Sequence, residues 1–240
     1  RNDGGVFTDV APELGLDDSQ PTLQVVWLDI DDDGDQDLYV GADRGQGGPF
    51  RNRMFRNDGD GTFTEVSEAS GTNVGADSMG IAVGDLDRNG ALDLYITNVS
   101  QSPNILLMND GTGTFTNQTS KAGVENNALS WGTQFFDFDN DADLDLYVCN
   151  SFPVLNRLYR NDGVWPFVDV APQMGVGAFG NSYGMALGDI DDDGDVDLVV
   201  SNDDELLKIF VNNEGSLRNF TRVRIDGVGW NLFAVGARLT

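Results

Sequence analysis

The nine residues Asp189-Ile-Asp-Asp-Asp-Gly-Asp-Val-Asp197 decide the fold, because three variants of them occur earlier in the chain. The variants are Asp29-Ile-Asp-Asp-Asp-Gly-Asp-Gln-Asp37, Asp85-Leu-Asp-Arg-Asn-Gly-Ala-Leu-Asp93 and Asp137-Phe-Asp-Asn-Asp-Ala-Asp-Leu-Asp145. Their first aspartates follow one another at intervals of 56, 52 and 52 residues. Such a period indicates a repeat protein in which each repeat is one supersecondary unit.

Two further markers keep step with the acidic segments. The phrase Asn-Asp-Gly stands at 2–4, 57–59, 109–111 and 161–163, and a variant of it, Asn-Asn-Glu-Gly, stands at 212–215. One phenylalanine recurs per unit, at Phe7, Phe63, Phe115, Phe167 and Phe220. Because three separate markers recur at the same spacing, we interpret the pattern as a genuine internal repeat.

Each unit reads as four short strands. In the second unit, apolar runs occupy 79–83, 92–96 and 105–108, and a fourth run opens at Phe115 and ends near Gly123. Runs of this length between Gly, Asn, Asp and Pro residues are typical of strands, and the Asp-Gly steps predict hairpin turns with positive φ. Four antiparallel strands in about 52 residues make a propeller blade.

We therefore expect an all-β propeller of four-stranded antiparallel blades, with an acidic loop between strands one and two of each blade. Residues 1–221 would hold about four full blades and the closing strand of another, which begins the chain at 1–15. Residues 222–240 would start a C-terminal segment or supply closing strands.

The acidic loops predict calcium sites. Side-chain oxygens fall at loop positions 1, 3, 5 and 9, position 7 is expected to offer a backbone carbonyl, and glycine at position 6 permits a tight turn. Calcium takes six to eight such hard oxygen ligands, whereas zinc and copper prefer His or Cys. The predicted metal residues, for about four Ca²⁺ ions, are Asp29, Asp31, Asp33, Asp35 and Asp37; Asp85, Asp87, Asn89, Ala91 and Asp93; Asp137, Asp139, Asp141, Asp143 and Asp145; and Asp189, Asp191, Asp193, Asp195 and Asp197.

An EF-hand shares the opening of this loop but needs a glutamate at position 12. That position holds Val40, Ile96, Val148 and Val200, all within strand-like runs, so the EF-hand fails in every copy. In the third loop Ala142 replaces the glycine, and a positive φ there would cost about 1 kcal/mol. Asn89 removes one charge from the second loop.

Charge excludes several function classes. The chain of 240 residues has 14 Lys+Arg, 40 Asp+Glu and no His, for a formal net charge of −26. Nucleic-acid binding needs a basic face, and histidine-based catalysis needs histidine. Half of the acids, 20, lie in the four loops, where carboxylates without a cation would repel one another. No apolar run is long enough to span a membrane, and no nucleophile elbow, phosphate loop or nucleotide fingerprint occurs, so we expect no enzyme.

The loops, with the Asp-Leu-Tyr-Val phrase at 37–40 and 145–148 and the Arg-Asn-Asp-Gly phrases, resemble FG-GAP/VCBS repeats of integrin-α-like propellers. The tail 219–227, followed by 231–238, resembles the start of the domain shared by the cartilage acidic protein and UnbV family. The resemblance implies an extracellular propeller, usually seven-bladed, with calcium between strands one and two. Four blades fall short of that number.

We expect an extracellular or cell-surface calcium-binding propeller that acts as a structural, adhesive or protein-interaction module, with a protein partner or self-association. The alternative is a carbohydrate-binding, lectin-like propeller or the non-catalytic part of a sugar-active enzyme. Trp27, Trp131, Phe179 and Tyr183 could stack on sugars or pack around the propeller axis. The first unit carries four extra residues in the Gly-rich, basic loop 41–53, which could instead bind an acidic partner.

Overall fold

The computed structural model describes residues 1–2, 4–16, 19–203 and 205–215. Within them the chain folds into four antiparallel sheets, each formed by consecutive strands. Blade 1 contains β1 (Thr22–Leu28), β2 (Asp37–Ala42), β3 (Arg53–Asn57) and β4 (Phe63–Glu65); blade 2 contains β5 (Ile81–Gly84), β6 (Asp93–Ile96), β7 (Ile105–Asn109) and β8 (Phe115–Asn117); blade 3 contains β9 (Ser130–Phe136), β10 (Asp145–Asn150), β11 (Arg157–Arg160) and β12 (Val168–Asp169); blade 4 contains β13 (Ser182–Gly188), β14 (Asp197–Asn202) and β15 (Lys208–Phe210).

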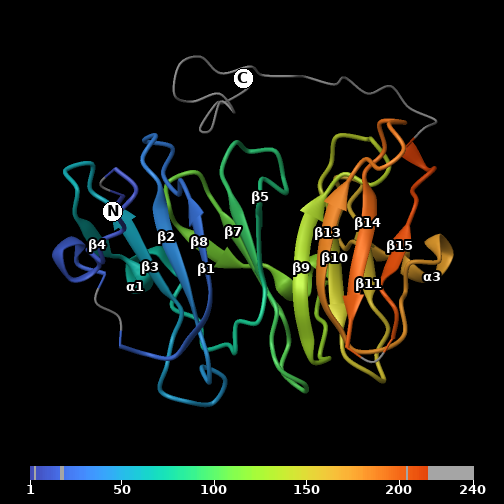
Figure 1. Cartoon of the computed structure of the whole chain (residues 1–240), viewed down its shortest axis with the longest axis horizontal. Helices are drawn as coiled ribbons and strands as arrows, with labels where there is room; N and C mark the ends of the chain where they lie inside the picture. Colours follow the sequence, from blue (N-terminus) through green and yellow to red (C-terminus); the bar gives the residue numbers. More distant parts are fainter. Residues whose placement is uncertain (3, 17–18, 204, 216–240) are drawn as a thin grey trace.

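The four sheets stand side by side as propeller blades (Figure 1). The first strands β1, β5, β9 and β13 contact one another in that order, and β4 and β15 lie at the two sides of the row. The predicted all-β class and the four-stranded blades are confirmed for blades 1 to 3, and each acidic loop joins strands one and two of its blade. Closure of the row into a ring is not seen in the described residues.

Packing between blades explains why the strands lack a polar face. Three apolar clusters lie in sequence between blades 1 and 2, between blades 2 and 3, and between blades 3 and 4. Tyr39, Tyr95 and Tyr147 are fully buried at the same strand position in blades 1 to 3. Each blade is thus covered by the next, and an inner sheet with two buried faces reads as a continuous apolar run.

The fourth strands are shorter than predicted. The run expected from Phe115 to Gly123 is wrong in its second half: β8 ends at Asn117 and the helical turn α2 (Thr119–Ala122) follows. The side chain of Asn117 accepts a hydrogen bond from the Thr119 N–H at 3.1 Å, which starts the turn, and Gly123 ends it at φ 68°. The same turn recurs as α1 (Ser67–Ser70) and α3 (Ala171–Met174), while η1 (Pro12–Leu14) precedes blade 1.

Two of the four aromatic residues singled out in the sequence, Trp131 and Tyr183, pack on each other, whereas Trp27 and Phe179 are about half exposed. The rings of Trp131 and Tyr183, from β9 and β13, lie 4.7 Å apart edge to face. A side chain at Gly80 would come within 2.2 Å of the Trp131 carbonyl oxygen, so glycine there permits the close approach of neighbouring first strands. The predicted marker Phe220 and the tail 222–240 lie outside the described residues. No helix in the described part of the chain is both long and apolar enough to span a bilayer.

Candidate metal sites

The four acidic loops adopt one local conformation. In each, the N–H of position 6 donates to the carboxylate of position 1, at 3.1 Å for Gly34 to Asp29 and 2.8 Å for Ala142 to Asp137. Position 6 has positive φ in every loop, including 71° at Ala142, as predicted. Position 4 is also left-handed, at 58° for Asp32, which the sequence did not predict. Two left-handed residues wrap each loop around its own carboxylates.

This wrapping gathers the acids. In each loop three carboxylates offer oxygens within 4.8 Å of one another. The sets are Asp29, Asp31 and Asp33; Asp85, Asp87 and Asp93; Asp137, Asp139 and Asp145; and Asp189, Asp191 and Asp197. Like charges this close repel unless a cation or protons neutralise them.

The donor set of the first loop fits a hard cation. Asp29 Oδ1 and Asp31 Oδ1 are buried and have no hydrogen-bond partner. A buried carboxylate oxygen without a donor is costly, and a bound cation would satisfy both oxygens together. Burial first, and then the charges of Asp33 and Asp29, raise the pKa of Asp31 above its ordinary value. Only oxygen ligands are present, which favours calcium among biological cations.

Position 9 holds the loop to the sheet. Asp37, Asp93, Asp145 and Asp197 are each 0% exposed. Asp145 accepts two backbone hydrogen bonds, at 3.0 Å from the Phe138 N–H and 2.9 Å from the Asn161 N–H, and the other three repeat this pair. Burial outweighs these bonds and raises the pKa of Asp145 to about 8 and that of Asp93 to about 7. The aspartate at position 9 of each loop therefore has a structural role besides its predicted role as a metal ligand.

The predicted ligand set is only partly brought together. Asp37 lies outside the cluster of its own loop, where Asp33 takes the third place. In the third loop a second group joins Asp139 and Asp141 to Asp162 of the Asn-Asp-Gly turn, a residue that we did not predict. Asn89 donates through its amide to the Asn109 carbonyl at 2.8 Å and accepts from the Ala91 N–H at 2.7 Å. The assignment of all twenty residues as calcium ligands stays a prediction.

The asparagine of the Asn-Asp-Gly phrase ties neighbouring blades together at the loops. Asn161 of blade 3 donates to the Leu86 carbonyl in the loop of blade 2 and to the Leu144 carbonyl in its own loop, both at 3.1 Å. Asn109 and Asn212 repeat this bridge, at 2.9 Å to Ile30 and 2.6 Å to Phe138. From the sequence we predicted only hairpin turns at these positions. A hairpin turn does not by itself require asparagine at the same place in every unit, so the repeated asparagine was a signal for this bridge.

A second link joins the side chains of adjacent loops. Arg88, at position 4 of the second loop, contacts Asp143, at position 7 of the third, with Nε to Oδ1 at 3.0 Å. Asn140, at position 4 of the third loop, donates to Asp195, at position 7 of the fourth, at 2.9 Å. Position 7 thus contacts the preceding loop through its side chain. Ala91, at position 7 of the second loop, has no polar side chain to make this contact. A cavity of about 290 Å³ lies there, between the first and second loops.

At the opposite ends of the strands a buried polar network repeats in blades 1 to 3. In blade 3 the Asn156 amide donates to the Tyr147 hydroxyl at 3.1 Å and to Ser182 of blade 4 at 2.9 Å. The Tyr147 hydroxyl in turn donates to the Val176 carbonyl at 2.7 Å. Blade 4 carries Val199 where the other blades have this tyrosine.

Comparisons with known proteins agree with the repeat. The FG-GAP-like repeat family matches residues 29–96 and 92–148, which together cover half of the chain. Cartilage acidic protein 1 of Xenopus tropicalis is 26% identical over 251 residues, covering 98% of this chain and 37% of that protein. The Homo sapiens protein of that name is 27% identical over 202 residues, covering 78% and 30%. The chain thus spans about a third of the length of these relatives.

Among solved structures, an Agrocybe aegerita lectin described as recognising non-reducing terminal N-acetylglucosamine aligns with 79% of this chain and 53% of its own. Its sequence identity is 20% and the TM-score is 0.42, so this likeness supports no statement about ligands. The repeat match, the acidic loops and the blade topology agree with one another. The chain belongs to the family of FG-GAP-like repeat proteins.

Proposed function

We propose that this chain is an extracellular, calcium-dependent propeller module that serves adhesion or protein interaction and carries out no catalysis. The observation that carries the proposal is the set of four equivalent carboxylate clusters, one between strands one and two of each blade. The two buried oxygens of Asp29 and Asp31 that have no hydrogen-bond partner support a cation in the first of them.

Calcium would act as a structural brace. The loops lie beside the asparagine bridges that link one blade to the next, so a cation in a loop would stiffen both a blade and its junction. A ligand that binds only the folded state stabilises it by about 2.7 kcal/mol at a hundredfold excess over its Kd. Half of the acids of the chain would then have a structural use rather than a catalytic one.

Calcium titration with thermal unfolding tests this function. We expect the Tm to rise with calcium, to fall in EDTA and to recover when calcium is restored, with magnesium a weak substitute. Asp31→Asn should weaken the response at one site, whereas Asp60→Asn, in an exposed turn, should leave it unchanged. Equal melting in calcium and in EDTA would refute the calcium function.

Association with a second copy is part of the same proposal. Phe7 is 80% exposed, and its bridge to Asn2 repeats the pairing of Phe63 with Asn57 in blade 1. Gly15 lies against the Phe63 carbonyl, as Gly71 lies against that of Phe115, and this likeness supports the proposal that the N-terminal segment is the closing strand of a blade. In the described residues β15 has only one neighbouring strand, and such an edge can accept a strand from a second copy.

Sedimentation in calcium distinguishes the outcomes. We expect a concentration-dependent dimer that Phe7→Asp weakens, and Thr64→Asp, on the exposed strand β4, serves as the control. A monomer at all concentrations would remove self-association and leave the calcium module standing.

A further inference from the structure

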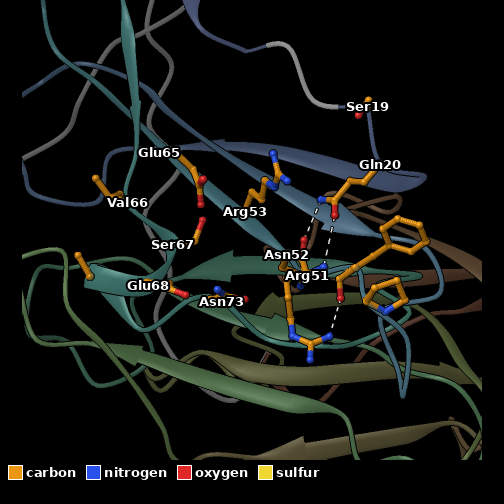
Figure 2. Close-up of a pocket in the computed structure, with 13 residues that line it drawn as sticks. Ser19, Gln20, Arg51, Asn52, Arg53, Glu65, Val66, Ser67, Glu68 and Asn73 are labelled. Carbon is orange, nitrogen blue, oxygen red and sulfur yellow. Dashed lines mark hydrogen bonds between the residues drawn. The ribbon is translucent and has the colours of Figure 1, made fainter.

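A cavity of about 610 Å³ lies on blade 1, and none of its lining residues belongs to an acidic loop. The connection between β2 and β3 contributes Phe50 and Arg51 to one wall, and Arg53 at the start of β3 adjoins them. The other wall is formed by β4 and α1, with Glu65 and Glu68 (Figure 2). The four extra residues of the first unit lie in this connection, so blades 2 and 3 have shorter equivalents. The cavity is therefore a feature of blade 1 rather than of the repeat.

The wall is held in shape by its own hydrogen bonds. Arg51 Nη1 donates to the carbonyls of Gly48 at 2.9 Å and Phe50 at 2.8 Å, which closes the connection on itself. Gln20 donates to the Arg51 carbonyl at 2.8 Å and accepts from its N–H at 3.3 Å, as Figure 2 shows. A pocket with a fixed shape loses less entropy when it binds a ligand.

The connection is also anchored to the start of blade 2. A side chain at Gly45 would come within 2.3 Å of the Ala76 carbonyl oxygen, so the two backbones are in direct contact. The Gln46 N–H donates to Asp77 at 2.9 Å, and Asn98 donates to the Gln46 side chain at 3.3 Å. The wall of the cavity therefore rests on two blades.

The opposite wall offers hydrogen-bond acceptors. Asn73 Oδ1 is buried and has no hydrogen-bond partner. A buried acceptor without a donor is costly to the fold, and a ligand in the cavity that Asn73 lines would supply that donor. Glu65 and Glu68 line the same wall, and both are exposed to solvent. A ligand that donates hydrogen bonds at several separate points would match this wall.

Charge and shape restrict the ligand further. The lining side chains include two arginines and two glutamates, so the described lining carries no net charge although the chain carries −26. Phe50, which is half-buried, adds an aromatic side chain to this lining. The volume is within the range of about 300–1,000 Å³ for small-molecule sites. Donors at several points, no net charge and an apolar face together describe a sugar ring.

We propose that this cavity is a binding site for a neutral saccharide, such as the terminal residue of a glycan. Hydroxyls of the sugar donate to Asn73, Glu65 and Glu68, and one face of the ring packs on Phe50. The site goes beyond the calcium function and does not depend on it, because no loop residue lines it. A failure here leaves the calcium proposal intact.

An array of neutral glycans, read in calcium, tests the site, with acidic glycans and free amino acids as separate probes. We expect at least one neutral glycan to bind, and the double variant Glu65→Ala/Glu68→Ala to weaken it at least tenfold with an unchanged Tm. Glu13→Ala is the matched control, because Glu13 is an exposed glutamate in the equivalent turn η1 and should leave binding unchanged.

A second variant tests whether glycan binding depends on the cavity rather than on the charge of the surface. Phe50→Ala removes the ring without altering charge and should also weaken the glycan. The proposal is overturned if no neutral glycan binds, if binding survives both variants, or if only amino acids bind, which would assign the acceptors to an ammonium group.

Discussion

Replacing Asn161 with alanine should remove the bridge between blades 2 and 3. Its amide donates to the carbonyls of Leu86 and Leu144 at 3.1 Å each, and its oxygen accepts from the Gly163 N–H at 3.0 Å. The residue is 2% exposed, so water cannot easily replace these partners. Each bond contributes about 1 kcal/mol net, and buried carbonyls left without donors add to the loss. We expect the free energy of unfolding to fall by about 2–4 kcal/mol.

Asn57 is the matched control, because it is the same residue of the same phrase in blade 1. Its amide donates to the Gln36 carbonyl at 3.3 Å, and its oxygen accepts from the Gly59 N–H at 3.1 Å. No bond from it to an earlier blade is present among the described residues, and the residue is half-buried. Asn57→Ala should therefore cost about 1 kcal/mol.

Urea unfolding in saturating calcium measures the loss of stability in both variants. In thermal unfolding, the Tm of a chain of this length should fall by about 5–15 °C for Asn161→Ala and by about 2–4 °C for Asn57→Ala. Asn161→Asp adds a test at constant volume, because it keeps the acceptor and abolishes both donated bonds. Equal losses for Asn161→Ala and Asn57→Ala, or near-wild-type stability of Asn161→Asp, would refute the bridge as the cause.

Three other perturbations follow from the loops. Ala142→Gly should stabilise the protein by about 1 kcal/mol in thermal unfolding, because Ala142 sits at φ 71°, and Gly34→Ala at φ 93° should destabilise it by at least as much. Asn89→Asp should tighten calcium binding at the second loop in a calorimetric titration, yet lower the calcium-free stability by about 1 kcal/mol, because a carboxylate cannot donate to the carbonyl of β7. Calcium-free protein should lose stability as the pH rises from about 4 to about 8, because the pKa values of Asp93 and Asp145 rise on folding from 3.8 to about 7 and about 8, so their contribution is largest when both are protonated.

The outcomes that contradict these expectations are distinct. A neutral or destabilising effect of Ala142→Gly would mean that the third loop relaxes its strain elsewhere. Weaker calcium binding by Asn89→Asp would show that loop rigidity, rather than charge, sets the affinity. Calcium-free stability that rises with pH would mean that the buried aspartates are ionised in the folded state.

The repeat itself could be predicted because its causes are local. Period, turn residues and the left-handed position 6 depend on neighbours a few residues apart, so Ala142 could be expected at positive φ from the sequence alone. The acidic loops were placed correctly between strands one and two for the same reason. The early end of β8 was missed, because the side chain of Asn117 and the backbone of Gly123 form a helical turn inside an apolar run.

Relations between blades were decided only by the tertiary structure. Asn161 and Leu86 are 75 residues apart, and Arg88 and Asp143 are 55 apart, so no pattern within one repeat shows that they meet. The same holds for the cavity on blade 1, because its lining combines residues before β1, the connection between β2 and β3, and the segment from β4 to Asn73. The sequence by itself determined the repeating unit, since a loop and its strands are made by residues close in the chain. The tertiary structure decided which carboxylates cluster and how one blade holds the next, because these contacts depend on distances across space that spacing along the chain does not determine.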